Sequence, residues 1–140
     1  MRVEVATDVL VTASRCVRAA GRTEEADALL TEALSAPYRV VYDLPLYLVE
    51  LGRGDDYLTL TEGNPGHAWE QAGRAAASRD LLGACEIYHS IGARFMEAWA
   101  GLLAAEHGDT SRLDTALAYF EEQQATPYVQ RCRALLQASA

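Results

Sequence analysis

The stretch "HSIGARFMEAWAGLLAAEHGD", residues 89–109, predicts a helix over 94–107 that lies between two glycine stops. Further apolar residues widen its apolar stripe until only Arg94 and Glu97 are clearly polar, which is typical of a helix buried on most of its sides. The stripe itself consists of Phe95, Ala98, Trp99, Leu102 and Ala105. Such a helix suits either the centre of a globule or one unit of a repeat, so the rest of the chain has to decide between them.

Helical periodicity also dominates the remainder of the 140 residues, and strand-like alternation is almost absent. The fold class is therefore predicted to be all-α. Pro45 is the exception inside an otherwise helical pattern, so a helix should begin at Asp43-Leu44 or be kinked there. The expected helices are 3–20, 23–35, 38–51, 54–62, 66–77, 80–91, 94–107, 111–124 and 127–138.

Short turns recur about every 30 residues along the chain, with two helices in each period, which is the mark of a helical-hairpin array. These turns are Gly21-Arg22, Gly52-Arg53, Ser78-Arg79 and His107-Gly108. The prediction is a single domain over 1–140 in the form of a stack of about four hairpins with a C-terminal capping helix at 127–138. The hairpins are expected at about 3–36, 37–64, 65–92 and 93–126.

Small and aromatic residues follow these turns at regular offsets, and the pattern resembles the tetratricopeptide repeat. The first unit carries Gly21, Ala26, Leu30, Ala33 and Pro37; the third carries Arg79, Ala84, Tyr88 and Ile91; the fourth carries Gly108, Ala116 and Phe120. The resemblance implies a right-handed tetratricopeptide-like stack, an α solenoid. The periods are shorter than the family's 34 residues, and the second unit has Pro45 where a small residue is expected.

Composition and charge exclude several function classes. The net charge is −8, all twelve basic residues are arginines, and no basic run occurs, which disfavours nucleic-acid binding. No stretch is long and apolar enough for a membrane span, and acidic residues interrupt the N-terminal apolar run, which makes it a poor signal peptide. Three widely spaced cysteines fit reduced thiols in a cytoplasmic protein.

No motif for catalysis or for a cofactor stands out. Cys85 and His89 share a helix face and could bind zinc, but no third ligand is evident, and a buried Cys beside an exposed His is the favoured interpretation. A Cys nucleophile activated by His89 would lack an orienting carboxylate. His107 sits at a helix end, where an imidazole favours the macrodipole. The chain is therefore expected to be no enzyme and to hold no metal or cofactor.

The tetratricopeptide resemblance implies a concave face lined by the first helix of each hairpin. On that face would lie Arg15, Arg18, Arg39, Tyr42, Trp69 and Phe95. An arginine–aromatic groove of this kind suits an extended peptide or an amphipathic helix. The alternative for each residue is simple packing or solvation.

A second resemblance concerns the C-terminal half. "WEQAGRAAASRDLLGACEIYHSIGARFMEAWAGLLAAE" (69–106) and "ALAYFEEQQATPYVQRCRALLQASA" (116–140) resemble the helical tail of bacterial multidomain regulators, and "IGA" and "ATPYV" prompt the comparison. Those regulators join an AAA or signal-transducing ATPase to a class III nucleotide cyclase or a LuxR-type domain. The resemblance implies an excised tail or a stand-alone relative.

Two functions follow as hypotheses. The first is a non-catalytic scaffold for protein–protein or interdomain interaction in a bacterial signalling or transcription regulator. The second is a small-ligand sensor, with an apolar pocket between hairpins lined by Trp69, Tyr88 and Trp99.

The two ends of the chain differ in polarity. The last helix has one apolar side and a polar remainder, as a capping helix should. The first helix carries valines on more than one face, including Val5 and Val9, which predicts a docking surface for another domain or for a second copy of the chain.

Overall fold

The computed structural model describes residues 6–37, 40–64 and 66–139, and within these it contains nine α-helices and no strand. The prediction of an all-α chain is confirmed for this part. The helices are α1 (Thr7–Ala19), α2 (Thr23–Ser35), α3 (Leu44–Glu50), α4 (Gly54–Leu60), α5 (Ala68–Ala77), α6 (Leu81–Ser90), α7 (Arg94–Glu106), α8 (Leu113–Glu122) and α9 (Thr126–Ala138).

Six of the helices end in the same backbone geometry. At the ends of α1, α3, α5, α6, α7 and α8, the second residue after the helix C-cap donates its N–H to a carbonyl five residues back, at 2.7 to 3.1 Å. This bond and a left-handed residue before it define the Schellman motif. Four of those left-handed residues are glycines, and the other two are Arg79 (φ 71°) and Gln124 (φ 56°). The left-handed conformation of Arg79 explains why Ser78-Arg79 acts as a turn like the glycine-containing ones. The recurrence of turns predicted from the sequence therefore has one backbone geometry behind it.

Several predicted boundaries were too generous. The segment 38–51 forms a helix only over Leu44–Glu50 among its described residues, because Pro45 occupies the first turn of α3 and sets its start. The segment 111–124 is shortened to Leu113–Glu122. Pro127 lies in the first turn of α9, as predicted.

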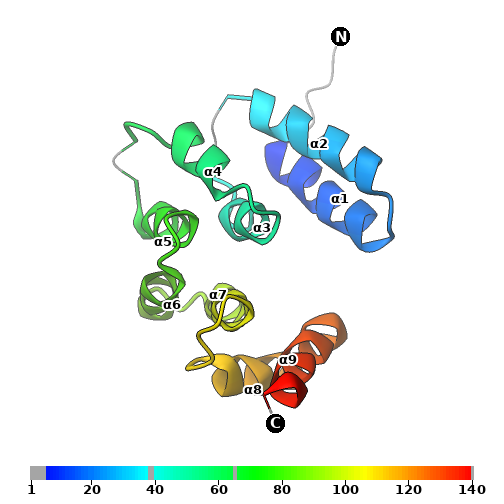
Figure 1. Ribbon diagram of the computed structural model, residues 1–140. Coiled ribbons are helices and arrows are strands. Elements are labelled where there is room, and N and C mark those ends of the chain that lie inside the picture. The colour runs from blue at the N-terminus through cyan, green and yellow to red at the C-terminus, as the bar shows by residue number, and fades with distance from the viewer. Residues whose placement is uncertain (1–5, 38–39, 65, 140) are drawn as a thin grey trace.

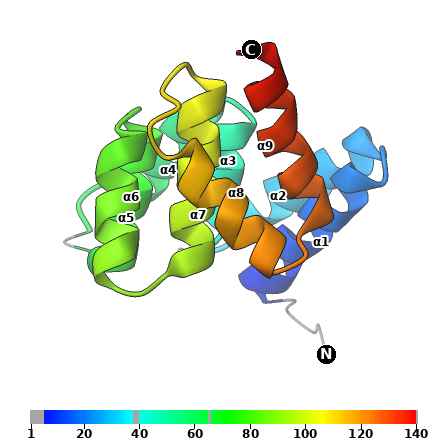
Figure 2. The same cartoon turned by 90° about the horizontal axis from the view of Figure 1, so that it is seen from below.

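Consecutive helices pack on each other from α1 to α2 and again from α3 to α9, and α3 also packs on α5 and α7, while α7 packs on α9. Figure 1 shows the consequence: α1 and α2 lie at one end of a curved arrangement, α8 and α9 at the other, and α3 and α7 between them. In the view of Figure 2, α9 lies on the same side of the molecule as α1 and α2.

Helix α7 is the most deeply placed element. Residues 98–105 are all buried, and α3, α6, α8 and α9 all contact this helix. In a linear solenoid each repeat contacts only its neighbours. Here α3 and α7 meet although the α5–α6 hairpin lies between them in the chain, so α7 is the central buried helix of the described residues.

A close contact holds α3 and α5 together. A Cβ at Gly73 would lie 2.8 Å from Cβ of Pro45 and 2.8 Å from Cε1 of Tyr57. Pro45, which departs from the repeat pattern, is thus accommodated by a glycine on the facing helix. Arg74, next to it, donates to the carbonyl of Leu58 at 3.1 Å and joins α5 to α4.

Candidate functional site

Arg15 of α1, which was predicted to line a groove, contacts side chains of α7, of α9 and of the N-cap of α3. Its Nη1 donates to Oδ2 of Asp43 at 2.9 Å, and its Nη2 donates to the hydroxyl of Tyr128 in α9 at 2.8 Å. Its guanidinium carbon lies 4.5 Å from the ring centroid of Trp99 in α7. Burial by itself lowers the pKa of Arg15, but the contacts with Tyr128 and Asp43 outweigh it and raise that pKa. Arg15 therefore ties the first helix to the last as a permanent cation.

Arg18, one turn further along α1, belongs to a second polar chain. It donates from Nε to the Tyr47 hydroxyl at 2.9 Å and pairs with Asp27 of α2. Ser14 donates to the carbonyl of Ala26 at 2.7 Å, so its single proton is used there and the Tyr47 hydroxyl donates to Ser14 Oγ at 2.8 Å. These bonds attach the α1–α2 hairpin to α3.

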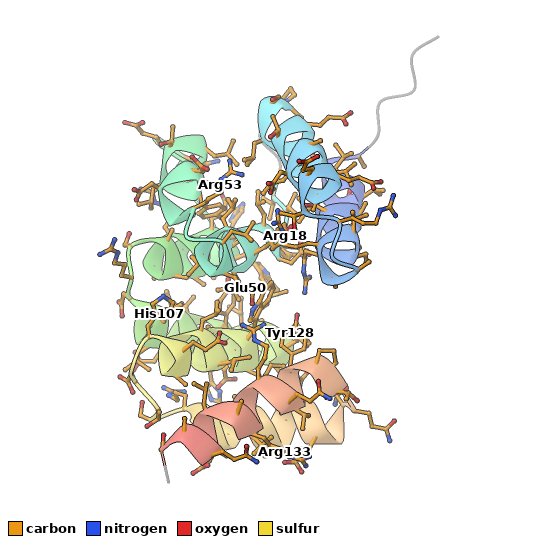
Figure 3. The ribbon with its side chains drawn as sticks, turned by 45° about the vertical axis from the view of Figure 1, so that its right-hand side comes forward. Arg18, Glu50, Arg53, His107, Tyr128 and Arg133 are labelled. Carbon is orange, nitrogen blue, oxygen red and sulfur yellow. The ribbon has the colours of Figure 1, made fainter. Side chains whose placement is uncertain are left out.

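The polar contacts continue towards the C-terminus of the array. Trp99 donates from Nε1 to Oε1 of Glu50 at 3.3 Å, and Nη1 of Arg131 lies 2.7 Å from the same oxygen. Arg131 also donates from Nη2 to Oε1 of Glu106 at 2.6 Å. In Figure 3, Glu50 and Tyr128 lie between α3 and α9, whereas Arg133 lies on the other side of α9. These contacts, together with those of Arg15, form one network, named here the inner network. It consists of Arg15, Asp43, Glu50, Trp99, Glu106, Tyr128 and Arg131.

Phe95 contributes to packing near this network. Its ring makes edge contacts with Trp99, Tyr119, Phe120 and Tyr128 at centroid distances of 5.4 to 6.4 Å. Among the predicted groove residues, Arg15, Arg18 and Phe95 are thus bound within the chain. Arg39 lies outside the described residues.

Tyr42 and Trp69 behave differently. Their ring centroids are 4.4 Å apart, and Tyr42 remains 54% exposed. Val40, two residues before Tyr42, is 43% exposed, so two of the four large apolar residues that are exposed in the described chain lie in the α2–α3 connection. We call Val40, Tyr42 and Trp69 the aromatic patch.

Trp69 also meets Tyr88 edge-on at 6.0 Å, but Tyr88 and Trp99 are completely buried. The Tyr88 hydroxyl has no hydrogen-bond partner among the described residues, and burial raises its pKa. Neither of the two pockets best formed on the described residues is lined by Trp69, Tyr88 or Trp99.

The more enclosed of those two pockets, of about 210 Å³, lies between α7 and α8 and was missed by the sequence analysis. Its walls carry charges of both signs and an aromatic ring over a floor of alanines. It is lined by Arg94, Glu97, Ala98, Arg112, Thr115, Ala116, Ala118, Tyr119 and Glu122. The sequence offers only a weak indication of this pocket. Arg94 and Glu97 are the clearly polar residues of the predicted helix 94–107, but nothing in the sequence indicates that they face α8.

The cysteines and histidines show no activated pair. Burial raises the pKa of Cys85 to about 11 and also raises that of Cys132, which opposes formation of the thiolate. His89 approaches Glu97 at 3.1 Å, and His107 meets the carbonyl of Leu103 at 2.7 Å, at the end of α7 where a histidine was predicted to stabilise the helix. Within the described ranges no three His, Cys, Asp or Glu side chains gather as metal ligands.

The predicted N-terminal docking surface is described only in part, because Val5 lies outside the described residues. Val9 is 54% exposed on α1, while Thr7, Leu10, Val11 and Ser14 form its buried side. A shallow depression lined by Asp8, Val9, Thr12 and Ala13 lies on the exposed side. No helix within residues 6–37, 40–64 and 66–139 has the length and apolar character that a bilayer span requires.

No protein-family model, curated protein or solved structure matches this chain.

Proposed function

We propose that this chain is a non-catalytic scaffold that binds another protein, or another domain of a parent regulator, through the aromatic patch. In this proposal the helices form a tetratricopeptide-like solenoid, strongly curved, in a cytoplasmic bacterial regulator. The observation that carries the proposal is the exposed Tyr42 ring, which packs at a tilt of 40° against Trp69 with the ring centroids 4.4 Å apart. Tyr and Trp are enriched among the residues that dominate binding energy at protein interfaces.

The contacts of Arg15 and Arg18 support this choice of surface over an open concave groove. Arg15 already donates to Asp43 and Tyr128, and Arg18 donates to Tyr47, so a peptide would compete with these bonds for the same arginines. Tyr42, by contrast, keeps more than half of its surface available. The raised pKa of Cys85 supports a role in packing over one as a nucleophile.

The test is to capture a partner from an extract of the source organism on the immobilised chain, purify it, and measure its affinity for variants by calorimetry. Tyr42→Ser should weaken binding by about 30-fold, the equivalent of a loss of about 2 kcal/mol typical of an interface hot spot. Leu136→Ser on α9 is the matched control, because Leu136 is also an exposed large apolar residue, at 37%. Equal affinities for wild type and Tyr42→Ser would reject the aromatic patch.

Self-association through α1 is the other form of the same proposal, and the exposed Val9 supports it. Sedimentation of the wild type and of Val9→Glu tests it: a dimer that dissociates in the folded variant is expected. A monomer at all concentrations would exclude it.

We propose a small-ligand sensor as the second function, supported by the pocket between α7 and α8. The three aromatic residues first considered for such a pocket pack with other rings. The pocket at α7 and α8 is therefore the place where a ligand is sought.

A further inference from the structure

The pocket between α7 and α8 exists because the two helices face each other with small residues. Arg94 at the start of α7 lies near Glu122 at the end of α8, so the helices run antiparallel. Ala98 and Ala116 are almost fully buried and form the floor. Gly101, one turn beyond Ala98, brings the two backbones close, since a Cβ there would lie 3.1 Å from Cβ of Arg112.

The size of the pocket restricts its ligand. Sites for drug-sized molecules usually occupy roughly 300–1,000 Å³. The pocket has about 210 Å³, which suits a smaller metabolite.

The charges of the pocket restrict the ligand further. Nη1 of Arg112 lies 3.8 Å from Oε2 of Glu97, beyond hydrogen-bond range, so this ion pair leaves donors and acceptors available. Nη2 of Arg94 lies 3.7 Å from Oε2 of Glu122, another loose pair. His89 approaches the same Glu97 carboxylate from α6 at 3.1 Å and stays 76% exposed.

Because the lining holds two arginines and two glutamates, a simple anion or a simple cation would meet repulsion along with attraction. A molecule with a carboxylate and an ammonium on neighbouring atoms satisfies both members of the Arg112–Glu97 pair at once. Arginine is well suited to the carboxylate, since its planar guanidinium can bind both oxygens.

From these observations we infer that the pocket between α7 and α8 binds a free α-amino acid. Its carboxylate lies on Arg112, its ammonium on Glu97, and its side chain runs over Ala98 and Ala116 towards Tyr119. The guanidinium carbon of Arg94 lies 5.0 Å from the centroid of the Tyr119 ring, and both residues line the pocket. This inference rests on the small-ligand function proposed above and names the class of its ligand.

The experiment is a titration of the isotope-labelled chain, followed by NMR, with each of the twenty free L-amino acids up to about 10 mM, where a Kd of about 1 mM gives near-saturation. At least one amino acid should shift the amide resonances of residues 94–98 and 112–122. Its amide and its N-acetyl derivative, which each lack one charge, should bind at least about tenfold more weakly.

Three variants place the binding in the pocket. Arg112→Gln, and separately Thr115→Phe at an exposed position of the lining, should each abolish the shifts while the remaining spectrum shows a folded chain. Arg133→Gln is the matched control, because Arg133 forms a similarly loose pair with Glu121, at 3.9 Å, outside the pocket. It should bind like the wild type.

The outcomes separate the inference from the function beneath it. If inorganic phosphate or an N-acetyl derivative shifts the same resonances and no amino acid does, the pocket is a ligand site but the assigned class is wrong. If neither the amino acids nor phosphate shift them, the small-ligand function at this site is rejected as well. Equal binding by the wild type and Arg112→Gln would also overturn the inference.

Discussion

Arg15 should be the most informative single position in the inner network, because it joins α1 to α3, α7 and α9. Arg15→Ala removes a charge-assisted hydrogen bond to Asp43, a bond to the Tyr128 hydroxyl and a guanidinium–ring contact with Trp99. Hydrogen bonds that involve charged groups contribute about 1.5–3 kcal/mol, and a cation–π contact contributes about 0.5–2 kcal/mol.

The side chain of Arg15 is 27% exposed, so water screens part of these contacts, and removing the arginine also relieves its desolvation. We therefore expect a loss near the lower end, about 2–3 kcal/mol of the free energy of unfolding. For a chain of this length the midpoint of thermal unfolding should fall by about 6–12 °C.

The assay is urea unfolding followed by circular dichroism, with Arg53→Ala as the matched control. Arg53 also forms an ion pair, with Asp56 at 2.7 Å, but that pair is exposed and local, so its loss should cost less than about 1 kcal/mol.

A double-mutant cycle of Arg15→Ala with Tyr128→Phe isolates the contact between the first and last helices. Tyr128→Phe keeps the ring that stacks on Phe120 at 4.8 Å and removes only the hydroxyl. The coupling energy should be about 1 kcal/mol. A coupling of zero would refute the reasoning, because Arg15 and Tyr128 would then not interact in solution.

The remaining predictions concern packing and the thiols. Trp99→Ala should cost about 3–5 kcal/mol in chemical unfolding, because Trp99 is completely buried; a loss below about 1 kcal/mol would contradict that burial. Gly73→Ala should cost about 1–3 kcal/mol in the same assay, because its Cβ would lie 2.8 Å from Pro45, and an unchanged stability would show that the helices can separate. Alkylation of the native chain at pH 8 should label the exposed Cys16 and spare the buried Cys85, as mass spectrometry of the peptides can establish; equal labelling would be the contrary result. Burial raises the pKa of Cys85 from 9.0 to about 11. The contribution of this buried thiol to the free energy of unfolding is therefore complete below pH 9 and is lost as the pH rises towards 11. A stability that increases between pH 9 and pH 11 would contradict this prediction.

Local features of this protein could be predicted from the sequence. The helical class, the turns at Gly21, Gly52 and Gly108, and the helix starts at Pro45 and Pro127 all follow from residues close in the chain. They could be predicted because helix periodicity, proline geometry and left-handed turns depend on neighbours within one or two turns. Arg79 shows the limit of this approach, since a non-glycine adopts the same turn.

Only the tertiary structure decided which predicted groove residues are available. Whether Arg15 stays open to a partner or binds Tyr128, 113 residues away, depends on how the first and last helices are placed relative to each other. The pocket likewise requires Arg94 and Glu97 of α7 to face Arg112 and Glu122 of α8. Curvature accumulates from small packing differences at every helix contact, such as the one that Gly73 permits against Pro45. No local pattern in the sequence encodes the accumulated curvature. The residues that meet at the candidate site therefore follow only from the tertiary structure.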